Sequence, residues 1–98
     1  MGYSITIAQV AENDARKAFL WYEEQKENLG SKFEEHFSEA IDSIRINPLK
    51  TQIRYGDIRV FFLKKFPFGI HFKVSGKNIL IVAVFHTSQN PERWKERG

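Results

Sequence analysis

Cysteine is absent from this sequence, and so are long hydrophobic runs. Without cysteine the fold contains no disulfide and no metal site built on thiolates, which is compatible with a reducing compartment such as the cytoplasm. The N-terminus lacks a basic region followed by an apolar run, so we expect no signal peptide. The longest strongly apolar run, Ile79–Phe85, is far shorter than the roughly 20 residues that span a bilayer.

Residues that commonly bind metals or cofactors are also few. The three histidines have no close spacing that would suggest a shared metal ion. Glu34, Glu35 and Glu39 fit one face of a charged helix better than a set of ligands. The sequence has no glycine-rich phosphate-binding loop and no nucleophile elbow. We therefore expect no metal and no cofactor.

The composition predicts one globular domain spanning residues 1–98. Hydrophobic residues make up 42% of the chain, which is enough to bury a compact core. Nine phenylalanines outnumber the three tyrosines and two tryptophans, so we expect a core built largely from aromatic rings.

Charge is distributed unevenly along the chain. The first 49 residues hold five Lys/Arg against nine Asp/Glu, a balance of −4, and the rest hold ten against three, a balance of +7; together they give the net +3. A basic half can attract nucleic acid or an acidic protein segment. The alternative is a solvated charge pattern that only keeps the protein soluble.

The first half of the chain predicts a short strand and a helical hairpin. Residues 3–8 alternate polar and β-branched side chains, as a strand does, and residues of about 9–46 show helical spacing of apolar side chains. We expect Gly30 to end the first helix and Ser31–Glu34 to form a capping box at the start of the second. Asn47 and Pro48 should close the second helix.

The second half predicts β structure. A strand is expected around residues 58–62, another over 68–74 and a well-buried one over 79–85, with a tight turn at residues 75–78. Pro91 could open a short C-terminal helix. The expected fold class is α+β: an N-terminal strand, a two-helix hairpin, and then a three-stranded antiparallel meander and the short helix. We expect the helices to pack on one face of the sheet, with Phe68, Ile70, Phe72 and Val74 facing them.

The opposite face of the sheet is where we expect chemistry. His71 and Lys73 should project from it, and we expect that face to be bare and rich in cations. Such a surface could neutralise RNA phosphates while a histidine moved a proton. His86 stands where the buried strand ends, and its structural alternative is a hydrogen bond to the adjoining loop, for example to Ser88 or Asn90. The other cations that we expect near this face are Arg54, Arg59, Lys64 and Lys65.

Several short segments occur in a fixed order along almost the whole chain. They are Trp21–Gln25 before Leu29-Gly30, Phe33 and Phe37, Ile44 with Asn47-Pro48, Tyr55 with Ile58-Arg59, Lys65–Ile70, Ile79–Val84, and His86 with Pro91–Trp94. No single motif decides the matter, but the ordered series resembles the RelE/ParE superfamily of toxins from type II toxin–antitoxin systems.

The resemblance implies a toxin fold and one of two activities. RelE-like members cut mRNA in the ribosomal A site with basic side chains, whereas ParE-like members lack that nuclease set and poison DNA gyrase. By this resemblance, the positions that carry arginines in the nucleases correspond to Gly69 and Gln89 here, which removes charge that the cleavage chemistry needs. The segment Lys65–Phe68 also favours the ParE-like branch.

The function expected from the resemblance is therefore that of a cytoplasmic toxin of the ParE type, the type associated with plasmid stabilisation. Such a toxin inhibits DNA gyrase, and a cognate antitoxin neutralises it by forming a hetero-oligomer with it. The alternatives are a ribosome-dependent mRNA endonuclease that uses His86 and Arg59, and a degenerate toxin retained as a complex partner. Trp21 and Tyr22 are either an interaction patch or core. The candidate contacts with the target or the antitoxin are Lys64, Lys65, Lys73, Arg93, Trp94 and Arg97.

Overall fold

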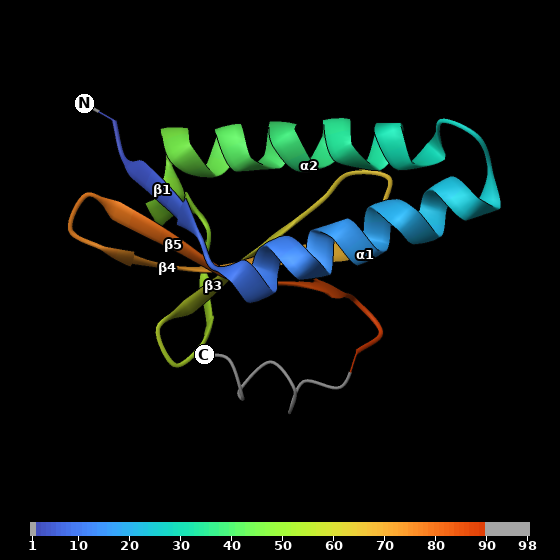
Figure 1. Ribbon diagram of the computed structural model, residues 1–98. Coiled ribbons are helices and arrows are strands. Elements are labelled where there is room, and N and C mark those ends of the chain that lie inside the picture. The colour runs from blue at the N-terminus through green and yellow to red at the C-terminus, as the bar shows by residue number, and fades with distance from the viewer. Residues whose placement is uncertain (1, 90–98) are drawn as a thin grey trace.

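A mixed five-stranded sheet and a helical hairpin form the molecule (Figure 1). The structure is a computed structural model, and it describes residues 2–89. The C-terminal helix predicted from Pro91 lies outside these residues, as do Arg93, Trp94 and Arg97. The elements in chain order are β1 (Ser4–Ile7), α1 (Gln9–Gln25), α2 (Leu29–Ile46), the 3-10 helix η1 (Pro48–Lys50), β2 (Ile53–Tyr55), β3 (Ile58–Phe62), β4 (Phe68–Ser75) and β5 (Asn78–His86).

The sheet order is β1-β5-β4-β3-β2, so the chain begins and ends its sheet on neighbouring strands. β1 pairs with β5 in parallel, and all other neighbours are antiparallel. The predicted three-stranded meander is confirmed. A fourth strand, β2, extends it; the sequence did not predict β2, because this strand has only three residues. A tight turn joins β2 to β3, and Gly56 adopts the left-handed conformation there, with a φ of 52°.

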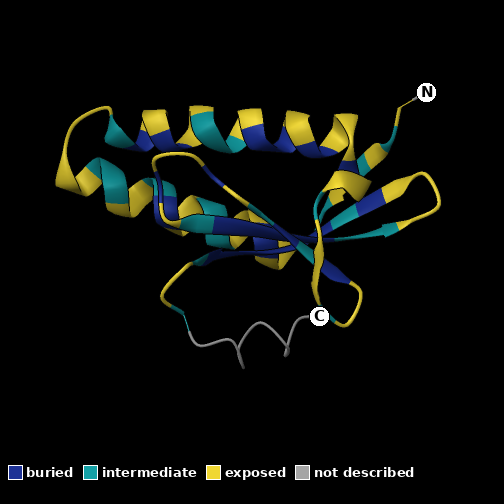
Figure 2. Ribbon diagram, turned by 180° about the vertical axis from the view of Figure 1, so that it is seen from behind, coloured by how far each residue is buried: buried dark blue, intermediate teal, exposed yellow. Residues whose placement is uncertain are grey.

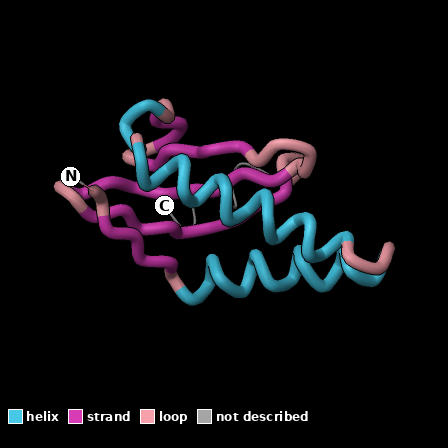
Figure 3. The backbone as a smooth tube through the Cα atoms, turned by 90° about the horizontal axis from the view of Figure 1, so that it is seen from above, coloured by secondary structure: helices cyan, strands magenta, loops and turns pink. Residues whose placement is uncertain are grey.

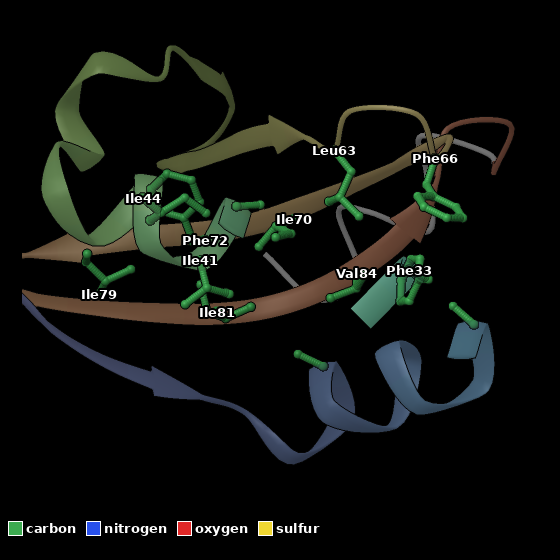
Figure 4. Close-up of a cluster of buried hydrophobic side chains, with 13 residues drawn as sticks. Phe33, Ile41, Ile44, Leu63, Phe66, Ile70, Phe72, Ile79, Ile81 and Val84 are labelled. Atoms are coloured by element: carbon green, nitrogen blue, oxygen red, sulfur yellow. The ribbon is translucent and has the colours of Figure 1, made fainter. Parts of the chain in front are cut away.

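The two helices lie over one face of the sheet (Figure 3), and the main core lies between them and the strands (Figure 4). Ile70 and Phe72 are fully buried there, and Phe68 and Val74 pack against the same core, so the predicted face of β4 is confirmed. Figure 2 shows the buried stripes of both helices turned towards the strands. The aromatic core is also confirmed, since the ring centroids of Phe33 lie 5.6 Å from Tyr22 and 5.3–5.4 Å from Phe68 and Phe66.

The junction of the two helices differs from the prediction. α1 ends at Gln25, and α2 begins at Leu29 after Asn28, which has a left-handed φ of 71°. Gly30 and Ser31 therefore lie inside the first turn of α2, and no side chain of the N-cap residue forms a capping hydrogen bond. Instead, the two carboxylate oxygens of Glu23 accept hydrogen bonds from the backbone N–H groups of Asn28 and Gly30, both at 3.0 Å.

Gly30 is needed for a close approach between the helices rather than for a helix stop. A Cβ at this position would lie 2.6 Å from the carbonyl oxygen of Phe19 and 2.9 Å from Oε1 of Glu23. Backbone atoms cannot yield as a side chain can, so any larger residue would push α2 away from α1.

The sheet face opposite the helices is not the bare basic surface that we predicted. Phe72 pairs with Ile81 whereas His71 pairs with Ala83, so Val82 is an extra residue that makes a β-bulge in β5. Val82 and Ala83 both join a second apolar cluster with Ile58 and Phe85. His71 is only 1% exposed, and its Nδ1 lies 2.9 Å from the hydroxyl of Tyr55.

Candidate protein-binding groove

A groove of about 630 Å³ lies between α1 and the end of β5. Its floor is apolar and comes from the main core, whereas its rim carries polar side chains. The lining residues are Asp14, Lys17, Ala18, Trp21, Tyr22, Pro67, Phe68, Val84, Phe85, His86 and Gln89.

The groove exists because β1 is shorter than β5. The two strands pair as far as Ile7 and Ile81, and the last hydrogen bond joins the N–H of Ala8 to the carbonyl of Ile81 at 2.9 Å. Beyond that point α1 replaces β1 beside β5 (Figure 3). The outer edge of β5 therefore borders a helix instead of a strand. A helix does not pair with this edge through backbone hydrogen bonds, so space remains between α1 and the end of β5.

Side chains satisfy the backbone along this unpaired edge. Asp14 on α1 accepts a hydrogen bond from the N–H of Val84 at 3.0 Å. The amide oxygen of Gln89 accepts one from the N–H of His86 at 2.7 Å, and the N–H of Gln89 returns one to the carbonyl of His86. These partners remove two backbone donors that an incoming strand could otherwise use.

His86 contributes a hydrogen-bond donor to the groove. Its Nδ1 accepts from the backbone N–H of Ser88 at 3.0 Å and lies 2.7 Å from the Ser88 hydroxyl. A nitrogen that accepts from an N–H carries no proton of its own, so the neutral ring must carry its proton on Nε2. Among the described residues, nothing hydrogen-bonds to Nε2. The structural alternative for His86, a bond to the adjoining loop, is therefore the arrangement that the structure has.

Trp21 and Tyr22 have different environments. Trp21 is 57% exposed, whereas Tyr22 packs against the core rings, and burial raises the pKa of the Tyr22 phenol above its ordinary value.

The sequence contains a pattern that indicates the groove wall on α1. Asp14, Lys17 and Trp21 recur at spacings of three and four residues, which places them on one face of α1.

Arg59 lies far from His86 and has a structural contact. Its guanidinium donates to the carbonyl of Thr51 at 2.5 Å and lies 3.4 Å from that of Leu49, so it ties η1 to β3. Arg59 pairs with Phe72 and His86 pairs with Phe68, four residues away on β4. At about 3.3 Å per residue, this separates them by at least about 13 Å. The structure does not bring the two candidate catalytic residues together.

Gly69, where the resemblance places an arginine of the nucleases, has no room for a side chain. A Cβ there would lie 2.8 Å from Cγ1 of Val60 and 3.3 Å from the ring of Phe62. Gln89, at the second such position, is engaged in the turn that follows β5. Neither position can present a guanidinium to a phosphate.

The predicted contact lysines lie apart on the described part of the chain. Lys64 and Lys65 are exposed in the loop between β3 and β4, and Lys64 lines a small hollow against α2 beside His36 and Glu39. Lys73 is half-buried near the other end of β4, where it pairs with Leu80 on the face opposite the helices. Arg54 stacks on the ring of Phe62, 5.1 Å from its centroid. The cations are thus distributed over several surfaces, which corrects the prediction of one cation-rich face.

Within residues 2–89, no cluster of three or more His, Asp or Glu side chains could hold a metal ion. None of the helices there is long and apolar enough to cross a membrane.

Residues 2–89 form a small α+β domain in which a groove lies between α1 and the end of β5. The model of the family described as ParE toxin of the type II toxin–antitoxin system parDE matches residues 5–91. The chain therefore belongs to the ParE toxin family, as the sequence resemblance predicted. Curated proteins give no match.

The fold is also similar to that of a solved structure. A chain of the chromosomal ParDE toxin–antitoxin system from P. aeruginosa superimposes with a TM-score of 0.78, at 18% identity, and the match covers 88% of this chain and 97% of that one. At this identity the likeness supports the fold alone.

Proposed function

We propose that this ParE-family protein inhibits DNA gyrase in the cytoplasm and is neutralised by a cognate antitoxin encoded beside it. The observation that carries the proposal is the family match over residues 5–91. Gyrase poisoning is the activity that the resemblance to ParE-like members implies, and it needs protein contacts rather than a catalytic centre.

Three features of the described residues count against the rival, a ribosome-dependent mRNA endonuclease. Gly69 leaves no space for a phosphate-binding side chain. Arg59 is committed to backbone carbonyls of residues 49–51. The Nε2 of His86 carries a proton in the neutral ring, so it cannot accept one as a general base unless the bond from Ser88 to Nδ1 is broken.

The contacts with the target are proposed on the basic side chains of the second half of the chain. Lys64 and Lys65 are exposed on one loop and can meet an acidic surface together. Lys73, Arg93, Trp94 and Arg97 remain the other proposed contacts with gyrase or the antitoxin.

The test begins with the toxin expressed without its antitoxin. We expect arrested growth, induction of the SOS response and broken DNA, because a poisoned gyrase leaves its cleaved intermediate behind. Purified protein added to gyrase, ATP and plasmid should accumulate linear DNA, whereas topoisomerase I should be unaffected.

His86→Ala is the discriminating variant. A gyrase poison should keep its toxicity when this side chain is removed, whereas an endonuclease that depends on His86 should lose it. Transcripts cut within translated regions, with intact DNA, would replace the proposal by the endonuclease. Unaffected growth would favour the degenerate toxin.

A further inference from the structure

We propose that gyrase contacts the edge of the sheet that is formed by the end of α2, η1 and β2. This surface, the edge patch, consists of Ile46, Leu49 and Ile53 with the neighbouring cations Lys50 and Arg54. The inference rests on the proposed function, because it assumes that gyrase is the target. It adds which surface the toxin uses, and it requires gyrase to offer an apolar depression bordered by carboxylates.

Three large apolar side chains protrude from the edge patch. Ile46 is 80% exposed, Leu49 55% and Ile53 51%, and all three lie within residues 46–53. Ile53 pairs with Arg59, whose guanidinium lies 3.4 Å from the carbonyl oxygen of Leu49, so both residues lie beside the same point of β3. Single exposed apolar side chains are ordinary, but three on one short segment are typical of a binding surface.

The edge patch also has a surplus of positive charge. Residues 42–64 hold five Lys/Arg against two Asp/Glu, a balance of +3. Lys50 and Arg54 are exposed and form no ion pair within residues 2–89. Asp42, one of the two acids, already pairs with Arg45 at 3.1 Å. A partner that covers this surface must therefore supply carboxylates as well as apolar contacts.

We expect side chains, rather than strand pairing, to make this contact. β2 is the last strand in the sheet order, so within residues 2–89 no strand lies beside its outer edge. It has only three residues, and the guanidinium of its middle residue, Arg54, stacks on the ring of Phe62. A short edge strand that carries a charge is a poor template for an added strand.

A second copy and a flexible segment fit the edge patch less well than a folded enzyme. In a symmetric contact between two copies, each Lys50 and Arg54 would meet the same cations of the other copy. A flexible segment gains most from a groove, whereas the apolar side chains of the edge patch protrude and none of them lines the groove beside β5. Protruding apolar side chains need a depression that is already present on the partner, which a folded enzyme such as gyrase can offer.

The test measures the toxin concentration that gives half-maximal linear DNA with gyrase, ATP and plasmid. The double variant Ile46→Gln/Leu49→Gln should raise this concentration at least about tenfold, because it removes two apolar anchors. Lys50→Glu should raise it at least about fivefold, because the new charge repels the carboxylates of the partner. The substituted side chains are exposed, so thermal unfolding should show both variants folded at the assay temperature.

The matched controls lie on the two helices. Val10→Gln/Leu20→Gln removes two apolar side chains of α1 that are 46% and 51% exposed, and Lys32→Glu reverses an exposed charge of α2. Lys32 lies about 21 Å from Ile46 along the helix, at 1.5 Å per residue. Both controls should act within twofold of the wild type.

Cross-linking gives a second measurement that does not depend on DNA cleavage. The chain has no cysteine, so Leu49→Cys can carry a benzophenone label at this position alone. In a mixture of toxin, gyrase and plasmid, we expect light to join this label to a gyrase subunit. The same label on Leu20→Cys should give no such product. No cross-link from Leu49→Cys, in a mixture where the labelled toxin still yields linear DNA, would overturn the proposal.

The outcomes separate this inference from the proposed function. If the wild type yields no linear DNA, gyrase is not the target and both fail together. If the wild type poisons gyrase and the edge-patch variants poison it within twofold, the target is right but the edge patch is not its contact. Equal losses in the edge-patch variants and the controls would also reject the edge patch. So would variants that poison gyrase normally and lose binding to the protein encoded beside the toxin, because the edge patch would then belong to the antitoxin.

Discussion

Glu23→Ala should destabilise the protein. Glu23 lies half-buried in the last turn of α1, next to the start of α2. The carboxylate accepts hydrogen bonds from the N–H groups of Asn28, the N-cap, and Gly30, in the first turn of α2, and N–H groups at these positions have no backbone acceptor within the helix. It also places a negative charge at the positive end of the α2 dipole. Loss of a capping side chain lowers the free energy of unfolding by about 0.5–2 kcal/mol. Because the Glu23 carboxylate is charged and accepts two hydrogen bonds, we expect a loss near the upper end of this range, about 2 kcal/mol.

The measurement is urea unfolding followed by circular dichroism. With a slope of about 1 kcal/mol per M, the midpoint of Glu23→Ala should fall by about 2 M, and the Tm should fall by roughly 8–15 °C. Glu23→Gln keeps one acceptor oxygen and loses the charge, so its loss should be about half as large. Glu24→Ala is the matched control, since Glu24 is exposed and has no hydrogen bond among those described; it should change the stability by less than about 0.5 kcal/mol.

Ser31→Ala decides between the two accounts of the helix junction. The capping box expected from the sequence requires the Ser31 hydroxyl, whereas the structure places Ser31 inside the first turn of α2 without that role. We therefore expect a change below about 0.5 kcal/mol. A loss as large as that of Glu23→Ala would refute the reasoning, and so would an unchanged midpoint for Glu23→Ala itself.

Three other substitutions test the remaining contacts. Gly69→Ala should cost about 1–3 kcal/mol in urea unfolding, because its Cβ would lie 2.8 Å from Val60, and a smaller loss would show that Val60 has room to move. Asp14→Ala should cost about 1–3 kcal/mol by leaving the N–H of Val84 without its acceptor, and an unchanged midpoint would contradict that bond. Burial raises the pKa of Tyr22, so the unfolded state loses this proton first and stability falls as pH rises above about 10; Tyr22→Phe should show a shallower fall between pH 9 and 11.

Periodicity predicted the elements of this fold well where the segments are long. The alternation of Phe68, Ile70 and Phe72 identified the face of β4 that meets the helices, because one face of that strand is regular and fully covered. β2 was missed because three residues carry too little pattern. The helix junction was misplaced because its capping group, Glu23, comes from the preceding helix rather than from the local Ser-x-x-Glu sequence.

The site was less predictable because its residues meet only in three dimensions. The alternation of apolar and polar residues in β4 predicted that His71 would be exposed to solvent. A histidine on the face opposite the helices is exposed only if no apolar cluster covers that face, and here a second cluster does. Composition does not reveal this, because Ile58, Val82 and Phe85 could equally well have served the main core. Lys64 and Lys73 are close in the sequence and lie near opposite ends of β4. Basic residues that are close in the sequence are therefore not necessarily close in space, and the prediction of one basic face was wrong for this reason.

The bulge at Val82 connects these features to the groove between α1 and the end of β5. In a regular strand Ile79, Ile81, Ala83 and Phe85 would share one face, and Val84 and His86 would point away from the helices. The extra residue reverses this alternation after Ile81, so that Val84 reaches the main core and His86 meets the ring of Phe68, 5.1 Å away. Because β1 ends at the same level, the residues turned by the bulge border the groove rather than a paired strand. One inserted residue and one short strand thus place the Nε2–H donor of His86 and the apolar side chains of Phe68 and Val84 along the same groove.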